Sequence, residues 1–242
     1  MQKIKQMIKK SINRFGYDLV PFTYRTHALP RQKKIMESYN IDLVLDVGAN
    51  IGNYGHKLLT KMGFKGTIIS FEPMKKEFNI LSDRCSSYYN WSAENIAFGD
   101  FNGTSSINIS ANSVSSSLLE ILPDHTDSAP LSKFIEVEEI RVVRLDKFLT
   151  EKKIQSSNIL LKLDVQGFEM EVINGAQKYF KNIKMLHIEL SLDELYKKGA
   201  MFEDIYSLLR TSGFKLVGVE PGFSRVTNGE LLQFDGLFVR CE

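Results

Sequence analysis

The pattern of apolar and polar positions along the chain predicts strands that alternate with helices. Short apolar runs of strand type occupy residues 43–46, 67–71, 95–97, 159–164 and 184–190. After the first run, Leu58, Leu59 and Met62 recur at helical spacing, and residues 31–40, 74–84 and 202–213 also favour helices. Residues 216–219 and 234–240 favour a terminal strand pair. This alternation predicts one α/β domain with a mostly parallel sheet.

The stretch between residues 99 and 145 interrupts the alternation. Asn102-Gly103 is a strong hairpin signal, and residues 106–109 alternate after it. Residues 110–130 are polar, which predicts a long loop that either closes over a substrate or is disordered. Residues 136–145 alternate again and favour a strand. We therefore expect a hairpin and loop insertion around 99–145 within a domain that spans residues 41–242.

Residues 1–40 stand before that domain and begin with a basic amphipathic helix. Ile4, Ile8, Ile12 and Phe15 recur at helical spacing, and no acidic residue occurs before Asp18. A helix of this kind can lie on an anionic membrane surface. Alternatively, it packs on the core or on a second subunit, as in a homodimer, with its lysines in solvent.

The composition narrows the class of protein. Hydrophobic residues make up 43% and charged residues 25% of the 242 residues, as in an ordinary globular domain. The formal charge of +2 gives no reason to expect a nucleic-acid partner. The two cysteines lack metal spacing, and neither a signal peptide nor a membrane-spanning run is visible. We expect a cytoplasmic protein, with peripheral contact at the inner membrane surface through residues 1–20 as an open alternative.

The segment from Asp46 to Gly52 predicts a ligand site, because a strand, a tight glycine turn and a helix follow one another. Gly48 and Gly52 would let a ligand approach the backbone. The spacing lacks the second glycine of the dinucleotide fingerprint, and Asp46 would repel a pyrophosphate. The same carboxylate suits a cationic ligand such as S-adenosylmethionine (SAM).

Two later positions fit the same type of ligand. Glu72 ends the second strand 24 residues after Gly48, and Pro73 holds it at the strand tip. An acid at that distance accepts hydrogen bonds from a ribose diol in doubly wound folds, although it could instead cap the next helix. Asn95 stands where an adenine edge would be recognised, or the following Gly99-Asp100 simply turns the chain.

With these segments in view, the chain resembles the FkbM family of SAM-dependent methyltransferases. The resemblance is carried by Asp46–Gly52, by Phe71-Glu72-Pro73 and by the block Leu161-Lys162-Leu163-Asp164-Val165-Gln166-Gly167-Phe168-Glu169. It extends over about 41–190, and the family usually has Glu where this chain has Gln166. The stretch from Ile12 to Tyr17 is similar to members associated with bacterial surface polysaccharide.

The resemblance implies a Rossmann-like class I methyltransferase fold, with a mostly parallel seven-stranded sheet, helices on both faces and an antiparallel last strand. It also implies a set of cofactor contacts. The amino acid end of SAM would contact Gly48, Asn50 and Gly52, and Asp46 would polarise that region. Glu72 would hold the ribose. Asn95 and Ile96 would contact the adenine, and Asp164 would face the cofactor region.

A hydroxyl acceptor must lose a proton during methyl transfer, so a base is needed. The candidates are Asp164, Glu169, His187 and Glu189, all expected at the carboxyl edge of the sheet. Glu169 could instead stabilise a helix N-terminus, and His187 could be a satisfied core residue. Asp164 and Glu189 could together hold Mg²⁺ through oxygen ligands, although nothing in their spacing requires a metal.

We expect O-methylation of a sugar hydroxyl in a bacterial polysaccharide or glycolipid pathway, with a glycan or another small molecule as the acceptor. Two alternatives stay open. The chain could methylate the nitrogen of a peptide or amine, or it could be a non-catalytic SAM-binding scaffold, because a fold does not fix a function.

Overall fold

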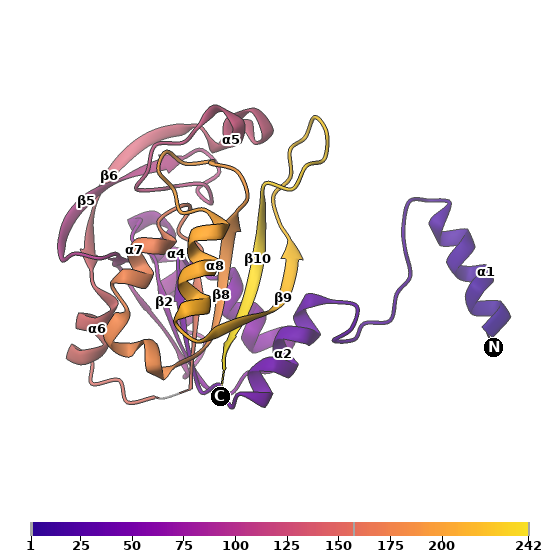
Figure 1. Cartoon of the computed structure of the whole chain (residues 1–242), viewed down its shortest axis with the longest axis horizontal. Coiled ribbons are helices and arrows are strands. Elements are labelled where there is room, and N and C mark those ends of the chain that lie inside the picture. Colours follow the sequence, from indigo (N-terminus) through magenta and orange to yellow (C-terminus); the bar gives the residue numbers. More distant parts are fainter. Residues whose placement is uncertain (1, 157, 242) are drawn as a thin grey trace.

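The computed structural model describes residues 2–156 and 158–241, and its centre is a seven-stranded sheet (Figure 1). Five strands run parallel, whereas β10 is antiparallel to both of its neighbours, β8 and β9. The sheet order is β3 (Trp91–Glu94), β2 (Thr67–Phe71), β1 (Leu43–Val47), β7 (Ile159–Leu163), β8 (Ile183–Ser191), β10 (Gln233–Arg240) and β9 (Phe214–Pro221). This arrangement confirms the predicted fold class.

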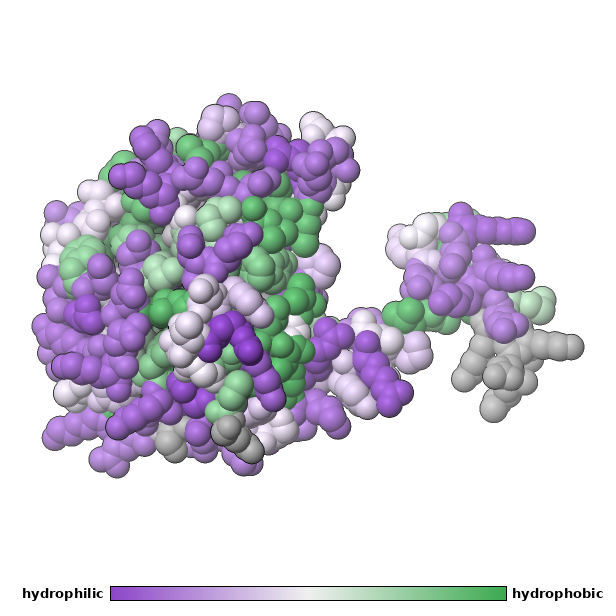
Figure 2. Space-filling model, in the orientation of Figure 1, coloured by the Kyte–Doolittle hydropathy of each residue, from purple (hydrophilic) through white to green (hydrophobic). Residues whose placement is uncertain are grey.

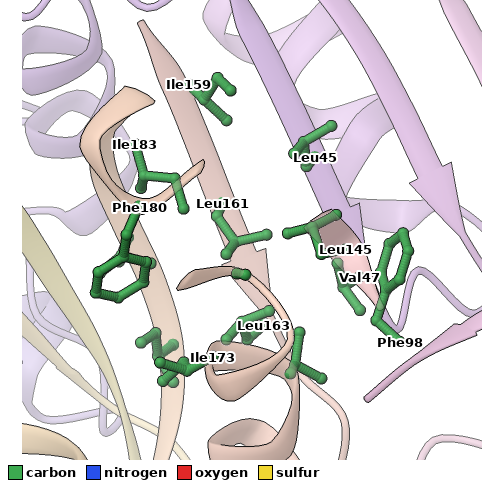
Figure 3. Packing of buried hydrophobic residues seen from close by; sticks show 14 of the residues in the cluster. Leu45, Val47, Phe98, Leu145, Ile159, Leu161, Leu163, Ile173, Phe180 and Ile183 are labelled. Carbon is green, nitrogen blue, oxygen red and sulfur yellow. The ribbon is translucent and has the colours of Figure 1, made fainter. Parts of the chain in front are cut away.

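The two central strands, β1 and β7, are apolar at every position except Asp46 and Lys162, because both faces of the sheet are covered. Leu45, Leu161 and Leu163 point to one face, where they pack with the side chains shown in Figure 3. Val44 and Leu160 point to the opposite face and belong to a second cluster. A strand buried on both sides reads as a continuous apolar run, which is why the sequence indicated these strands clearly.

Helices lie on both faces, as expected. Residues of α6 (Leu145–Glu151), α7 (Glu169–Asn174), the 3₁₀ turn η3 (Gln177–Asn182) and α8 (Phe202–Thr211) pack in the first cluster. Residues of α2 (Ala28–Ser38), of the π-helical turn η1 (Leu58–Met62) that continues α3 (Asn53–Lys57), and of α4 (Lys75–Cys85) pack in the second.

A small second sheet covers one end of the molecule and corrects two sequence predictions. Its order is β4 (Ala97–Phe98), β6 (Phe134–Val143) and β5 (Gly103–Ser110), so β4 and β5 both pair with β6 and not with each other. The turn signal at Asn102-Gly103 therefore does not join two paired strands; the antiparallel pair within 99–145 is β5 with β6, with a long loop between them. The strand expected at 95–97 is also displaced: the main sheet uses Trp91–Glu94, and Ala97 begins β4.

The loop between β5 and β6 follows the prediction in part. It carries the short helix α5 (Pro123–Ser128) and the 3₁₀ turn η2 (Pro130–Ser132). Ser117 of the loop and Asn108 of β5 exchange backbone hydrogen bonds of 2.8 and 3.1 Å, which folds the serine-rich part back onto β5. This loop is thus ordered against the second sheet.

The first helix, α1 (Gln2–Asn13), projects away from the rest of the molecule (Figure 1). A connector with several apolar residues joins it to α2, as the space-filling view shows (Figure 2). Among the described residues, no helix has both the length and the apolar character needed to cross a membrane.

Candidate functional site

The carboxyl ends of β1, β2 and β7 meet at one edge of the sheet, where two hollows adjoin. Both are lined by Gly48, Asn50, Val114 and Asp164. The first, here called the apolar cleft, has a volume of about 650 Å³ with its open mouth and is lined further by residues of 71–74, 96–98, 107–118 and 165–168. The second, here called the polar hollow, has a volume of about 1120 Å³ with its open mouth, and adds residues of α2, α3, β7, β8, β9 and β10.

The apolar cleft combines aromatic walls with one carboxylate. Phe71, Phe98 and Phe168 line it together with Glu72 at the tip of β2. Glu72 is buried, and its two oxygens accept hydrogen bonds from the backbone N–H of Asn50 at 2.7 Å and of Met74 at 3.0 Å. Burial raises the pKa of Glu72 to about 7 in spite of these bonds. Each carboxylate oxygen retains lone pairs that can accept hydrogen bonds from a ligand.

Asn95 and Ile96, both predicted to contact adenine, have different positions. Ile96 lines the apolar cleft, whereas Asn95 is not among its lining residues. The Asn95 side-chain amide donates to the backbone carbonyls of Glu72 and Pro73 at 2.9 and 2.8 Å. Asn95 therefore fixes the strand tip that carries Glu72.

The glycine turn is shaped by packing within the protein. Gly48 has φ +75, and a Cβ built there would lie 1.8 Å from the backbone oxygen of Asp164. Gly52 has φ +82, and its Cβ would lie 2.7 Å from Leu81 and 2.9 Å from Trp91. We expected these glycines to let a ligand approach the backbone, but the close neighbours of both positions are residues of the chain itself.

Asn50 lines both hollows, as Gly48 does, and it is the one of the two that carries a side chain. Its side-chain amide donates to the Ser113 hydroxyl at 3.1 Å, and its side-chain oxygen accepts from the backbone N–H of Ile51 at 2.9 Å. Asn50 thereby joins the β1 turn to the serine-rich loop over the mouth of the apolar cleft.

Asp46 does not reach either hollow, contrary to its predicted contact with the ligand. It is fully buried, and Oδ2 accepts a hydrogen bond from the Ser70 hydroxyl at 2.8 Å. Oδ1 lies 3.6 Å from Nζ of Lys162, an ion pair without a hydrogen bond. Burial raises the pKa of Asp46, and Lys162 opposes this rise. Any effect of Asp46 on a ligand must therefore pass through Lys162.

Lys162 is the residue of the site that sequence reasoning missed. Its Nζ lies 3.1 Å from Oδ2 of Asp164 and 3.3 Å from the Gly48 carbonyl, which accepts a hydrogen bond. Burial lowers the pKa of Lys162, but attraction to Asp164 and Asp46 outweighs burial and raises it overall. A lysine inside an apolar strand, two residues before Asp164 and so on the same face, is the signal that could have identified it.

Asp164 is held between Lys162 on one side and Gln166 on the other. The Gln166 amide donates to Oδ1 of Asp164 at 2.8 Å and to Glu189 at 2.7 Å. The Tyr196 hydroxyl donates to the Gln166 side-chain oxygen at 2.7 Å. Asp164 is 38% exposed at its side chain and lines both hollows, so it is the carboxylate that a ligand in either hollow can touch.

The two glutamates predicted as catalytic candidates line neither hollow. Glu169 is buried and accepts hydrogen bonds from the backbone N–H of Val165 at 3.0 Å and of Gly167 at 3.4 Å, so it stabilises the turn before α7. Glu189 accepts from Gln166 and, at 3.0 Å, from Gln233. Burial raises the pKa of Glu169 to about 7 and that of Glu189 well above its usual range.

His187 lines the polar hollow, but both of its ring nitrogens have neighbours. Nε2 lies 3.4 Å from Asp235, and Nδ1 lies 3.3 Å from both the Tyr54 hydroxyl and the Gln32 amide. Burial raises the pKa of Asp235, but its hydrogen bond and attraction to His187 lower it overall. His187 is therefore placed to organise the wall of the polar hollow.

The described residues, 2–156 and 158–241, contain no group of three or more His, Cys, Asp or Glu side chains arranged to hold a metal ion. The pair predicted as an Mg²⁺ site, Asp164 and Glu189, is joined by the Gln166 amide.

Unusual backbone conformations gather at the apolar cleft. Six described residues other than glycine have positive φ, and Asn50, Ser113 and Gln166 among them line this cleft with φ of 48, 57 and 56. Such conformations cost about 1–3 kcal/mol each and cluster at ligand sites. The backbone thus marks the same place as the carboxylate and the aromatic walls.

Comparison with known proteins gives one family and a set of distant structures. The sequence model described as the methyltransferase FkbM domain matches residues 46–216. Magnesium protoporphyrin IX methyltransferase from Synechocystis, solved with bound SAM, is 10% identical over 98% of this chain and 97% of its own, with a TM-score of 0.48. An rRNA methylase from Streptococcus thermophilus is 9% identical over 90% and 98%, with a TM-score of 0.45. No curated protein sequence matches the chain.

Proposed function

The chain belongs to the FkbM methyltransferase family, and we propose that it transfers the methyl group of SAM to a sugar hydroxyl in a bacterial polysaccharide or glycolipid pathway. The observation that carries this proposal is the position of Asp164, which lines both the apolar cleft and the polar hollow. One carboxylate at the junction can act on a methyl donor in one hollow and on an acceptor in the other.

The apolar cleft fits the nucleoside part of SAM. Phe98, Ile96 and Phe168 offer apolar surfaces for a purine, and Glu72 offers carboxylate oxygens for a ribose diol. Asn50, at the rim, would contact the amino acid end. When bound, SAM supplies a methyl group that is activated by the positive sulfur.

The polar hollow fits a hydroxyl-rich acceptor. Its walls carry both signs of charge and several amide and hydroxyl groups, from Gln32, Asn53, Tyr54, Lys57 and Asp235. Sugars are recognised by many hydrogen bonds of this kind, and a wholly apolar wall would leave their hydroxyls unpaired.

Asp164 is the residue we assign as the general base. Lys162 and Gln166 fix its two oxygens, so that its orientation is set before the acceptor binds. It would accept the hydroxyl proton as the acceptor oxygen forms its bond to the methyl group. A carboxylate held in this way accelerates the reaction more than a freely rotating one, because the reacting groups are already aligned.

Asp164→Asn tests this assignment. The amide keeps the shape of the side chain but is not a base, so we expect the turnover number to fall about 10²–10⁴-fold, which is the usual contribution of general acid–base catalysis. SAM affinity, measured by calorimetric titration, should change less than tenfold. Methyl transfer from labelled SAM to sugar, peptide and amine acceptors would be measured in parallel.

Asp83→Asn is the matched control, because Asp83 is exposed on α4 and its carboxylate makes no hydrogen bond among the described residues. Unchanged turnover in Asp164→Asn would remove Asp164 as the base. Transfer to peptide or amine acceptors alone would replace the sugar acceptor, and SAM binding without transfer to any acceptor would favour a scaffold.

A further inference from the structure

The N-terminal arm, defined as residues 2–26, exposes a series of apolar side chains to solvent. They come from α1 and from the connector after it, and their exposed fractions range from 39% to 80%: Met7, Ile8, Phe15, Tyr17, Leu19, Val20, Phe22 and Tyr24. Isolated apolar residues are common on protein surfaces, but eight of them within 18 residues of one segment indicate an interaction site.

The arm meets the rest of the chain at its C-terminal end, where Tyr24 contacts Arg31 and Lys34 of α2. Its ion pair joins Lys9 to Asp18 at 3.1 Å, and its backbone hydrogen bonds after α1 stay within the segment up to His27. Figure 1 shows α1 well separated from the sheet and its helices. The apolar side chains from Met7 to Val20 are therefore left exposed to solvent.

The net positive charge of the chain comes from the same arm. Lys3, Lys5, Lys9, Lys10 and Arg14 precede the first acidic residue, Asp18. Of the 31 Lys and Arg residues, 26 therefore remain in 18–242 against all 29 Asp and Glu residues, a net charge of −3 for that part. An acidic body thus carries a basic and apolar arm.

We propose that the N-terminal arm binds an anionic membrane surface, with α1 lying in the plane of the interface. Apolar residues of α1 and the connector would enter the boundary between headgroups and acyl chains, while the basic residues contact anionic headgroups. Tyr17 is of a residue type that is enriched at membrane interfaces. Phe15 and Phe22 are of a type found on the apolar face of interfacial helices. In this arrangement the exposed apolar surface of the arm contacts acyl chains, and its excess positive charge contacts anionic headgroups.

Two other partners use only part of these features. Pairing of the arms of two copies would bring equal positive charges together, and a helix of 12 residues is shorter than the three or four heptads of a stable coiled coil. A nucleic acid would attract the lysines but would leave the aromatic residues of the connector in water. The anionic membrane is therefore the partner that the arm fits.

The arm is attached beside the polar hollow. Leu29 and Gln32, at the start of α2, line the hollow, and Arg31 of the same helix donates to the Tyr24 carbonyl at 3.2 Å. Membrane binding through the arm would keep the hollow within the length of the connector from the lipid surface, where an acceptor carried on a lipid is found. Membrane binding itself does not depend on the proposed activity.

The test is sedimentation of the full chain with vesicles of phosphatidylcholine alone and with vesicles that also contain phosphatidylglycerol. We expect binding to the second kind at low salt and its loss at about 1 M salt, where the Debye length is about 3 Å. Lys10→Glu with Arg14→Glu should weaken binding roughly tenfold or more. Met7→Gln with Ile8→Gln should weaken it as well, because an interfacial helix needs its apolar face.

Val226→Gln is the matched control, since Val226 is 75% exposed on the opposite, C-terminal part of the chain and should not affect binding. Circular dichroism would confirm that each variant is folded. Equal sedimentation with neutral vesicles, or none with either kind, would overturn the proposal. So would a dimer, detected by sedimentation velocity, that Met7→Gln with Ile8→Gln dissociates, or salt-sensitive binding to RNA in place of vesicles.

Discussion

Lys162 lies between β1, the turn after β1 and the end of β7, and its positive charge offsets the negative or partly negative oxygens that these three segments direct toward it. Its ammonium faces Asp46, Asp164 and the Gly48 carbonyl, and it lies over the Tyr54 ring at 5.6 Å. Without this cation, a fully buried carboxylate at Asp46 would be left with the Ser70 hydroxyl alone. Removing one partner of a buried ion pair is costly because the other charge is left uncompensated, whereas replacing both partners by apolar residues is often neutral.

Lys162→Met should therefore reduce the free energy of unfolding by about 3–5 kcal/mol, the usual cost of leaving a buried charge unpaired. Urea unfolding at neutral pH would measure the change. Adding Asp46→Asn to the same chain should recover part of the loss because the unpaired carboxylate is removed. A loss below about 1 kcal/mol in the single variant would show that water or a shifted side chain replaces the ammonium.

Glu169 predicts a pH dependence of stability. Its pKa is about 7 in the folded protein and about 4.5 in its ordinary state, so the unfolded chain loses this proton first as the pH rises. The free energy of unfolding should thus fall between about pH 4.5 and 7, by on the order of 3 kcal/mol for this group. Glu169→Gln keeps an oxygen for the Val165 N–H and removes the titration.

Urea unfolding at pH 4.5 and at pH 8 would compare this variant with the parent chain. The difference between the two pH values should be smaller in Glu169→Gln. Glu203→Gln is the control, because Glu203 also lies in the first turn of a helix but is exposed. An identical pH dependence in parent and variant would mean that Glu169 is ionised in the folded protein.

Residues of the site were predictable where their chemistry is local. Asp164, Glu72 and Asn50 follow strands, and such positions converge at one edge of a parallel sheet. Asp46, near the end of β1, and Glu169, at the start of α7, lie close to the same edge, yet they turn inward to bind Lys162 and backbone amides. The direction of a side chain depends on partners that are distant in sequence, so spacing alone could not separate the two groups.

At the scale of elements, the close approach of the β1 turn to the end of β7 sets the geometry of the site. The Asp164 backbone N–H donates to the Val47 carbonyl at 3.2 Å, and Gly48 leaves no room for a side chain beside the Asp164 carbonyl. The two loops that line both hollows are thus fixed relative to each other.

Gly48→Ala should separate these loops. A Cβ at 1.8 Å from a backbone oxygen forces a shift, so we expect a loss of stability above about 3 kcal/mol and weaker SAM binding. Gly63→Ala is the control, since Gly63 has φ +68 but open space around it. That change should cost about 1–2 kcal/mol from the left-handed conformation alone. Equal effects of both changes would mean that backbone conformation, not contact with β7, governs Gly48.

The elements themselves were predictable to different degrees. Strands β1, β2 and β7 are buried on both faces and therefore read as apolar runs. The second sheet was missed because its pairing joins β4 to β6 across 35 residues between Phe98 and Phe134, whereas Asn102-Gly103 offers a local turn signal. A short-range signal cannot show that a distant strand takes the place beside it.

At the scale of the whole molecule, a folded body and the N-terminal arm are independent parts. Deleting residues 1–26 should leave the thermal midpoint within about 2 °C, because less than about 1 kcal/mol of contact is removed. Deleting residues 1–40 is the control and should lower the midpoint strongly, since α2 buries Met36 and Gln32 against the body. Calorimetry would measure both. A large drop in the shorter deletion would reveal packing of the arm on the body.

The separation of charge between the two parts also makes the molecule an electric dipole. An anionic surface attracts residues 2–17 and repels the body, whose net charge is −3. The connector would then act as a tether under tension, and the body would remain at a distance from the lipid that shrinks as salt screens the repulsion. Acceptors with long headgroups would reach the site across that gap more easily than short ones, so ionic strength would tune the choice of substrate as well as the strength of attachment.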